Sequence, residues 1–532
     1  MPEKTLLRAK RAMGTLAAVL FGAGVFLRLA ALIHPGFINI DQARYLVDAH
    51  HLRSGAGYSD SRGPETHVHP LLPGLVALLG TSLSTLELRG RLVTCLASIL
   101  VLGLFTLLAR RLAGAQCAIL FLLLAAFHPR LLETSGWIQP EGLHAFLVAS
   151  ALSLLLFVEA LGGSEAAGAA AGALFGLAYL TRPEGFLVGL VVSGIVLACG
   201  DRSPGRRARK AGCILAGLVL VSSPYLLFLH RHLGEWALTG KTADIFFIGQ
   251  ALDASGGVPF DADVLLRLKA QWGGIVPYAT ANPGKTLLAV LRNGGRVWVG
   301  IVPRILGPAG ILGCLLWAAF YLRRKNGRAQ WALLLCPLLT LFLMAFTFPN
   351  ELVALSVLPF LMMLAAAGFS QGADRLESAS KSRRRPAGAA FFVLLLLGQG
   401  PGFLRFLSAR MSGVPPIETR AIREALATGA AREAIASSNA AISFQLFDPF
   451  LFGIPGRYRP LPVEGSCADL LLAMERRGAK VAILDRVGAP PRIDLVSRQC
   501  PVALLKQMAD PARGSSIWIL ERKFSTLDEA RP

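Results

Sequence analysis

The sequence predicts a polytopic α-helical membrane protein, with about 11–13 membrane helices, followed by an exported α/β domain. Three observations lead to this fold class. The 532 residues have a mean hydropathy of +0.54 and only 16% of them are charged, which is too apolar for a soluble enzyme. Apolar runs recur throughout residues 1–404. Residues 405–532 are less hydrophobic, and strand-like runs alternate there with helix-like runs.

The first apolar run, residues 13–33, is long enough to span the roughly 30 Å hydrocarbon core of a bilayer. Basic residues precede it, Arg28 lies near its far end, and no small-residue cleavage site follows. We therefore interpret it as an uncleaved helix, with a signal peptide as the alternative. The further candidate spans are residues 90–109, 115–127, 141–161, 166–180, 184–199, 211–230, 305–322, 331–348, 351–370 and 388–404.

Basic clusters recur at alternate junctions between these runs. They are Arg110–Arg111 and the segments 202–210, 323–328 and 375–385. Placing each cluster in the cytoplasm satisfies the positive-inside rule. The N-terminus is then cytoplasmic and the C-terminal region periplasmic, in a protein that we expect in a bacterial inner membrane. The net charge of +21 then reflects topology rather than nucleic-acid binding. Residues 166–180 and 184–199 are short for full spans, so a hairpin of partial depth is an alternative.

Function is expected in the segments that this topology places outside, residues 34–89, 128–140, 231–303 and 405–532. The chain is therefore divided into a transmembrane domain, residues 1–404, and a periplasmic domain, residues 405–532. In the second domain we predict strands at residues 441–447, 480–484 and 516–520, and helices at residues 417–436 and 467–477. Cys467 and Cys500 are the only cysteines outside apolar runs, and therefore the only disulfide candidates.

The first outside loop places three functional side chains on one helical face. Asp41, Arg44 and Tyr45 have the spacing i, i+3 and i+4. A carboxylate at the membrane surface can act as general base on an acceptor hydroxyl, while the cation and the phenol hold an anionic group such as a phosphate. The alternative is an exposed helix with a local Asp41–Arg44 pair.

Two further constellations involve ionisable residues at the ends of predicted spans. Glu141 opens the run 141–161, where it is either a second carboxylate facing Asp41 or a charge that interacts with the helix dipole. Arg182 and Glu184 lie in the connector between two short apolar runs. Charged groups at membrane depth usually line a polar cavity, although pairing between the two would explain them equally well.

The sequence also bears on metal binding and on nucleotide chemistry. Glu65, His67 and His69 alternate along an extended segment, which would place three metal ligands on one face, although ordinary polar loop residues are the alternative. The sequence contains no phosphate-binding GxxxxGK[ST] loop and no GxGxxG. An exported reaction would therefore take its energy from an activated lipid-linked substrate.

Taken together, the motifs resemble integral-membrane glycosyltransferases of the GT-C class. The branch that contains the protein O-mannosyltransferases and the lipid A aminoarabinose transferases is the most similar. The residues that carry the resemblance are Asp41 to Tyr45, Gly57-Tyr58, His69-Pro70, Pro140-Glu141 and Leu180 to Gly185. The resemblance implies a polyprenyl-phosphate sugar donor, an acceptor hydroxyl on a lipid, glycan or protein, and transfer on the periplasmic side.

The same resemblance implies roles for individual residues. Asp41 would be the catalytic carboxylate and Glu141 the carboxylate of the second loop. Arg44, Tyr45, His69 and Arg182 would contact the donor phosphate, and a divalent metal is the one cofactor considered. Gln42 stands where the family often has a second acid, and His69 where some relatives have lysine. A phosphate contact at His69 would then depend on its protonation. The competing readings are a transporter or lipid flippase and a polysaccharide ligase or polymerase.

Overall fold

A computed structural model describes most of the transmembrane region and part of the C-terminal region. The described residues are 3–33, 38–60, 63–80, 82–159, 165–199, 203–254, 268–321, 335–379, 398–408, 417–427, 435–437, 461, 464–477, 479–486, 492–494, 502–510 and 515–522. The chain divides into two compact units. The first comprises Met1–His34, Thr66–Leu72 and Arg91–Met411, and the second comprises Pro35–Glu65, Pro73–Gly90 and Ser412–Pro532.

The first unit begins with two long helical segments, α1 (Glu3–Ile33) and α4 (Leu86–Ala126). Gly114, with φ 87°, interrupts the helical geometry of α4. The rings of Phe105 and Phe121 lie on either side of it, and their centroids are 5.8 Å apart. In one straight helix the two residues would be separated by about 24 Å. The chain therefore reverses at Gly114, which confirms the predicted runs 90–109 and 115–127 as two helices.

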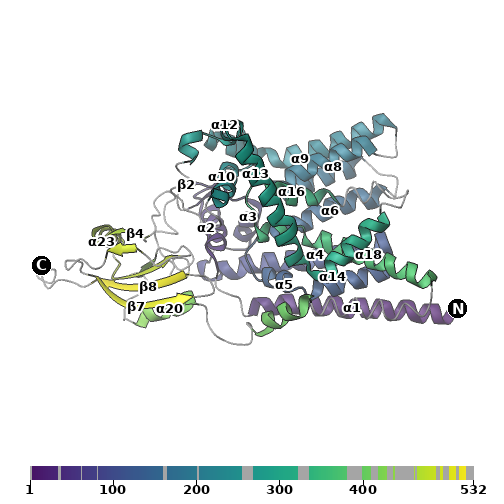
Figure 1. The fold of residues 1–532 in the computed structure, drawn as a ribbon, viewed down its shortest axis with the longest axis horizontal. Coiled ribbons are helices and arrows are strands. Elements are labelled where there is room, and N and C mark those ends of the chain that lie inside the picture. The colour runs from purple at the N-terminus through teal and green to yellow at the C-terminus, as the bar shows by residue number, and fades with distance from the viewer. Residues whose placement is uncertain are drawn as a thin grey trace, which may run out of the picture. The chain divides into compact units, whose positions relative to one another are not determined.

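Five helices follow, and glycines allow them to pack closely. They are α5 (Pro129–Ser135), α6 (Glu141–Glu159), α7 (Glu165–Tyr179), α8 (Glu184–Cys199) and α9 (Pro204–Leu233). A Cβ atom at Gly172 of α7 would overlap the carbonyl of Ile214 in α9, and one at Gly217 would overlap the carbonyl of Ala169. The backbones of α7 and α9 thus touch at this crossing. Figure 1 shows α8 and α9 running side by side.

The later part of the first unit is also helical. Its elements are α10 (Thr242–Ala254), α12 (Ile275–Ala281), α13 (Pro283–Gly295), the π-helical η2 (Arg296–Ile301), α14 (Val302–Tyr321), η3 (Cys336–Leu338), α16 (Leu339–Phe346), α17 (Glu351–Leu355) and α18 (Leu358–Ala379). Residues 398–408 are helical as well. Gly313 and Gly368 form the contact between α14 and α18, since a Cβ at Gly368 would overlap the carbonyl of Gly313.

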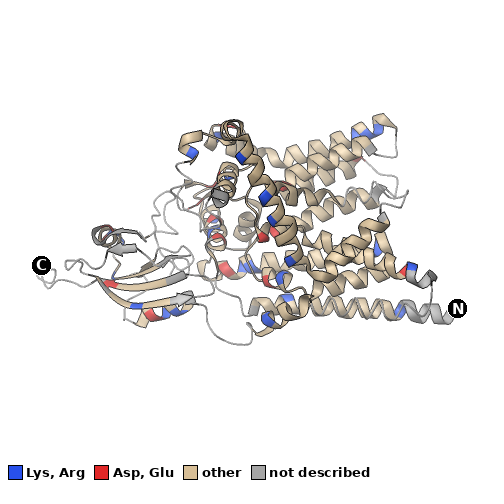
Figure 2. Ribbon diagram, in the orientation of Figure 1, with Lys and Arg blue, Asp and Glu red and all other residues tan. Residues whose placement is uncertain are grey.

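The lengths and composition of the helices agree with a polytopic membrane protein. Four described stretches are long and apolar enough to cross a bilayer, namely Arg11–Leu32, Leu83–Ala126, Pro204–Leu233 and Pro283–Phe320. Shorter apolar helices cover Glu141–Phe157, Glu184–Ala198 and Cys336–Phe346. Figure 2 shows the helices of this unit largely free of charge along their middle, with basic residues at the first end of α9. The predicted fold class is confirmed.

The second unit contains much of the first loop. Its elements there are α2 (Ile40–Ser54), the antiparallel pair β1 (Ser59–Asp60) and β2 (Gly63–Pro64), most of α3 (Leu71–Leu78), and η1 (Leu83–Thr85). α2 ends at Gly55, whose φ of 84° is the left-handed conformation that glycine adopts readily. The nitrogen of Gly55 donates to the His51 carbonyl, which closes the helix.

The C-terminal residues form an α/β domain, as predicted. A four-stranded sheet has the order β3 (Ile435–Ser437), β5 (Val481–Arg486), β8 (Ser515–Arg522) and β7 (Val502–Asp510), and β4 (Glu464–Ser466) pairs with β6 (Arg492–Asp494). Alternate residues of β5 face two different helices. Ile483 packs in a core with α20 (Ile417–Ala427), and Leu484 packs in a core with α23 (Cys467–Glu475).

The predicted elements of this domain were partly wrong. The strands at 480–484 and 516–520 are confirmed by β5 and β8. The helix predicted over 417–436 ends at Ala427, and its last residues belong to strand β3. Strand β7 was missed. The strand predicted at 441–447 and the cysteine Cys500 lie outside the described residues.

Candidate active site

The start of α2 presents Asp41 to solvent. Asn39 caps the helix, because its side-chain oxygen accepts from the backbone nitrogen of Gln42 at 2.8 Å. Asp41 follows in the first turn and is exposed, whereas Gln42 is buried. Tyr45, one turn further on, is half-buried. A carboxylate in this position is accessible to a reactant and lies next to the positive end of the helix dipole.

Arg44 is held by acidic residues of its own unit. Its Nε donates to Glu65 at 2.6 Å, and a second nitrogen lies 2.9 Å from the other Glu65 oxygen and 3.2 Å from Asp60. Burial works against the charge of Arg44, but Glu65, Asp48 and Asp60 outweigh it and raise its pKa above the ordinary value. The guanidinium is thus a structural anchor of the first loop, and the local Asp41–Arg44 pair is replaced by these longer-range pairs.

Arg182 joins two carboxylates from different helices. Its Nη1 lies 2.6 Å from Glu141 at the start of α6, and its Nη2 lies 3.2 Å from Glu184 at the start of α8. All three side chains are largely buried, with exposed fractions of 12%, 7% and 15% for Arg182, Glu141 and Glu184. The structure therefore brings together two predicted site residues, Glu141 and Arg182, with Glu184 as their common neighbour.

A cavity of about 260 Å³ opens beside this cluster. One part of its wall is polar and includes Arg182, Glu184 and Lys241. The remainder is mostly apolar, with Leu187 of α8, Ile245 of α10 and Met344 of α16 among its residues. A long apolar chain that ends in an anion would match both parts of the wall. The threonines of the lining, which supply hydroxyl groups, are Thr239, Thr242, Thr340 and Thr347.

His69 lies close to this cluster but is neutral. Its ring packs edge-on against Tyr179, with centroids 5.4 Å apart, and against Tyr225 at 5.2 Å. Its Nε2 lies 3.3 Å from the carbonyl of Leu238. Burial, and next the nearby charge of Lys241, lower the pKa of His69 to about 3. A cationic contact from His69 to a phosphate therefore has no support, and Lys241 supplies charge in this region instead.

The three predicted metal ligands are engaged elsewhere. Glu65 binds Arg44, His69 contacts the Leu238 carbonyl, and His67 Nε2 lies 3.2 Å from Asp244, which also binds Lys269. Burial would raise the pKa of Asp244, but hydrogen bonds with His67 and Lys269 lower it below its ordinary value. Within the described part of the chain, no group of three His, Cys, Asp or Glu side chains is arranged to hold a metal ion.

Lys241 and Glu184 line this region, but neither was among the residues assigned to the site from the sequence. Lys241 lies 59 positions after Arg182, in a loop whose spacing gives no pattern. Glu184 was recognised only as the neighbour of Arg182.

Comparisons with known proteins agree with this geometry. Residues 68–228 match the family model described as dolichyl-phosphate-mannose-protein mannosyltransferase. ArnT from Cupriavidus metallidurans in the apo state is 16% identical with a TM-score of 0.55, over 96% of this chain and 98% of that chain. The same protein bound to undecaprenyl phosphate is 17% identical with a TM-score of 0.53, over 94% and 97%. The chain has the GT-C fold.

A third structure extends the GT-C comparison. The Archaeoglobus fulgidus oligosaccharyltransferase, in complex with Zn and sulfate, is 16% identical with a TM-score of 0.54, over 88% of this chain and 68% of that chain. A search of curated proteins finds no match. The resemblance inferred from the sequence is thus confirmed, and the fold is of GT-C type. The family match covers Glu141, Arg182 and Glu184 but neither Asp41 nor Lys241.

Proposed function

We propose that this protein transfers a sugar from a polyprenyl-phosphate donor to an acceptor hydroxyl on the periplasmic face of the membrane. The cavity beside Arg182 carries the proposal, because a polar part of the wall that includes Arg182 and Lys241, together with an apolar remainder, complements an anionic lipid. The relative that is solved with undecaprenyl phosphate has the same fold and supports a ligand of this class. Polyprenyl chains would lie along the apolar side chains, and the phosphate would lie at the polar part of the wall.

We propose Lys241 as the main contact of the phosphate. Arg182 already has a carboxylate on each side, so its field is largely cancelled before a ligand arrives. Lys241 adds a second positive charge to the same wall. As the bond between the sugar and the phosphate breaks, the departing lipid phosphate gains negative charge, and a cation at this place would stabilise the transition state.

Asp41 is proposed as the general base. It would take the proton of the acceptor hydroxyl, whose oxygen then attacks the anomeric carbon while the lipid phosphate leaves. Its exposed position in the first turn of α2 supports this role, as does the resemblance to the GT-C family. Inversion at the anomeric carbon is implied by that family. Glu141 is proposed to hold Arg182 in place rather than to take a proton itself, because its Oε1 is committed to that guanidinium.

The test is sugar transfer by the full-length protein in nanodiscs, with a panel of radiolabelled polyprenyl-phosphate sugars. We expect the wild-type protein to transfer labelled sugar to an acceptor, or slowly to water. The Asp41→Asn variant should transfer sugar at least about 100-fold more slowly, because a general base usually contributes a rate factor of this size. Asp469→Asn, in the C-terminal domain, is the matched control and should keep full activity. Monodispersity and thermal unfolding establish that each variant is folded.

The outcomes separate the competing functions. Transfer to lipid, glycan or protein acceptors supports the proposal and identifies the acceptor class. Extension of an existing polysaccharide would instead indicate a ligase or polymerase. Equal behaviour of wild type and Asp41→Asn across the whole panel would exclude Asp41 as the base.

A further inference from the structure

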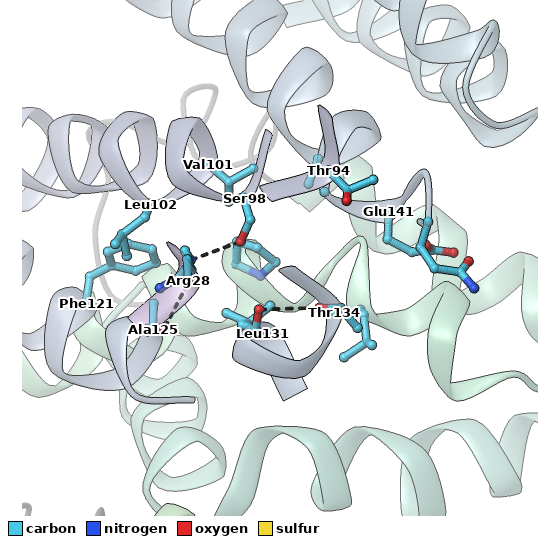
Figure 3. A pocket seen from close by; sticks show the side chains of 15 residues that line it. Arg28, Thr94, Ser98, Val101, Leu102, Phe121, Ala125, Leu131, Thr134 and Glu141 are labelled. Atoms are coloured by element: carbon cyan, nitrogen blue, oxygen red, sulfur yellow. Dashed lines mark hydrogen bonds between the residues drawn. The ribbon is translucent and has the colours of Figure 1, made fainter. Parts of the chain in front are cut away.

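A second, smaller cavity lies behind Glu141. It is enclosed by α1, α4, α5, α6 and the start of α18, and its polar lining consists of Arg28, Thr94, Ser98, Thr134, Gln139 and Glu141. Figure 3 shows Arg28 and Glu141 at opposite ends of this cavity, with the hydrogen bond from Arg28 to Ser98 between helices. Its volume is about 30 Å³. A buried water needs about 10–15 Å³ of such space, so one or two waters fit.

Two polar atoms on the lining lack a protein partner. Among the described residues, neither Nε2 of Gln139 nor Oε2 of Glu141 has a hydrogen-bond partner, although both atoms are buried. Both residues are only 6% exposed. One atom is a donor and the other an acceptor, which is the pair of contacts that a water molecule makes.

The hydroxyl of Ser98 adds a third polar group to the same cavity. Ser98 Oγ accepts from Arg28 Nε at 2.9 Å, so its own proton remains to be donated. The other nitrogens of Arg28 donate to the carbonyls of Gly24 and Ala125 at 3.0 and 3.2 Å, which fixes the guanidinium against α4. The cavity is therefore polar and rigid, and it offers the two to four partners that an ordered water requires.

We propose that this cavity is an internal water site and that Gln139, acting through its water, is a positioning residue for Glu141. Glu141 would then be held from both sides, with Oε1 on Arg182 and Oε2 on the water that Gln139 anchors. This fixes the carboxylate that in turn orients Arg182 at the wall of the larger cavity. The role of Gln139 in turnover rests on the proposed function, whereas the water site itself does not.

The water site is tested by a structure of the wild-type protein in nanodiscs at a resolution that shows ordered water. Density within hydrogen-bond distance of Gln139 Nε2 and Glu141 Oε2 is expected. Gly142→Ala offers a second test, because Gly142 lines the cavity and a Cβ there would meet nothing closer than 3.8 Å. Its methyl group should reduce the water density without unfolding the protein. A dry cavity in the wild-type structure would overturn the water site.

The positioning role is tested by Gln139→Met, which keeps the side-chain length and removes the amide. We expect turnover to fall about tenfold, the rate effect of one lost hydrogen bond, with KM for the donor changed less than about twofold. Gln139→Asn, which keeps an amide that water can reach, should recover most of the turnover. Gln399→Met is the matched control, because Gln399 is also a buried amide and lies outside this cavity lining.

Three kinetic results bear on the positioning role. Loss of turnover in Gln139→Met alone, with rescue by Asn, supports it. Wild-type turnover in Gln139→Met, or an equal loss in Gln399→Met, overturns it. If wild type transfers sugar from no donor, the proposed function fails and the positioning role fails with it, while the water density still decides the water site.

Discussion

Two arginines that the sequence suggests for phosphate binding are already occupied by carboxylates. Arg44 is engaged by Glu65 and Asp60, and Arg182 by Glu141 and Glu184. Paired guanidinium groups contribute less to the binding of a further anion, since their fields are partly cancelled. The proposed phosphate contact is therefore assigned to Lys241, which follows in a later loop.

Removing this lysine should weaken donor binding. Lys241→Met is expected to reduce the affinity for undecaprenyl phosphate about tenfold or more, because hydrogen bonds to charged groups are worth about 1.5–3 kcal/mol. The measurement is the ligand-dependent rise in unfolding temperature of the protein in detergent. Lys285→Met, at an exposed position of α13, is the control and should bind as wild type does. Equal affinities for both variants would remove Lys241 from the site.

His69 predicts a specific dependence of stability on pH. Its pKa is about 3 in the folded protein, against an ordinary value of 6.5, so the unfolded chain binds a proton first as the pH falls. Above about pH 6.5 the neutral His69 costs the folded protein no stability. Between pH 6.5 and pH 3 the free energy of unfolding decreases as the pH falls, because only the unfolded chain binds the proton. At pH 5 the loss amounts to about 2 kcal/mol. His69→Phe, which keeps a ring beside Tyr179, should lack this part of the acid destabilisation in thermal unfolding.

At the scale of helices, contact between backbones sets the packing of α7 and α9. Gly217→Val would force side-chain carbons against the Ala169 carbonyl, so we expect a destabilisation of about 1–3 kcal/mol, the usual cost of overpacking. Gly212→Val is the matched control, because a Cβ at Gly212 has nothing within 4 Å. Thermal unfolding of both variants checks this prediction. A Gly217 variant as stable as the Gly212 variant would contradict the close crossing.

Helices and strands were predicted correctly from the sequence where a single physical effect, such as burial in lipid, determines the structure of the segment. Within the described residues, the predicted apolar runs are helical over most of their length, since burial in lipid requires an internally hydrogen-bonded backbone. Residues 331–334 and 388–397 of two predicted runs lie outside the described residues. The loop predicted at 128–140 instead contains α5, a short helix capped by His128, whose Nδ1 lies 3.4 Å from the Leu131 nitrogen. Strand β7 was missed because its register shifts between Leu504 and Lys506, which breaks the alternation that identifies strands.

The site was harder to predict than the helices. From the sequence, pairing between Arg182 and Glu184 was one of two explanations for these residues, because ionisable groups at span ends are costly and need partners, and the structure contains this pair. The contact of Arg182 with Glu141 was not predicted, since Glu141 was expected to face Asp41. Pairings such as that of Arg44 with Glu65 join residues 21 positions apart, and the pattern of a single helix contains no information about them. The pKa of His69 likewise depends on burial among rings that the sequence does not show to be close.

For the whole molecule, the proposed topology can be tested by chemical labelling. Thr280→Cys, exposed in α12, should react with a membrane-impermeant maleimide in intact spheroplasts. Ser203→Cys, exposed beside the basic start of α9, should react only after permeabilisation. Both changes are made in a background with Cys467 and Cys500 replaced by serine. The reverse labelling pattern would invert the topology and place the proposed reaction in the cytoplasm.

The reversal of α4 at Gly114 also bears on how the protein is made. A single non-helical residue joins the two apolar halves of α4. No connecting loop therefore separates them that would let the first half enter the membrane before the second half is synthesised. We therefore expect the two halves to enter the bilayer together as a hairpin, with the arginines at 110 and 111 retained beside the turn.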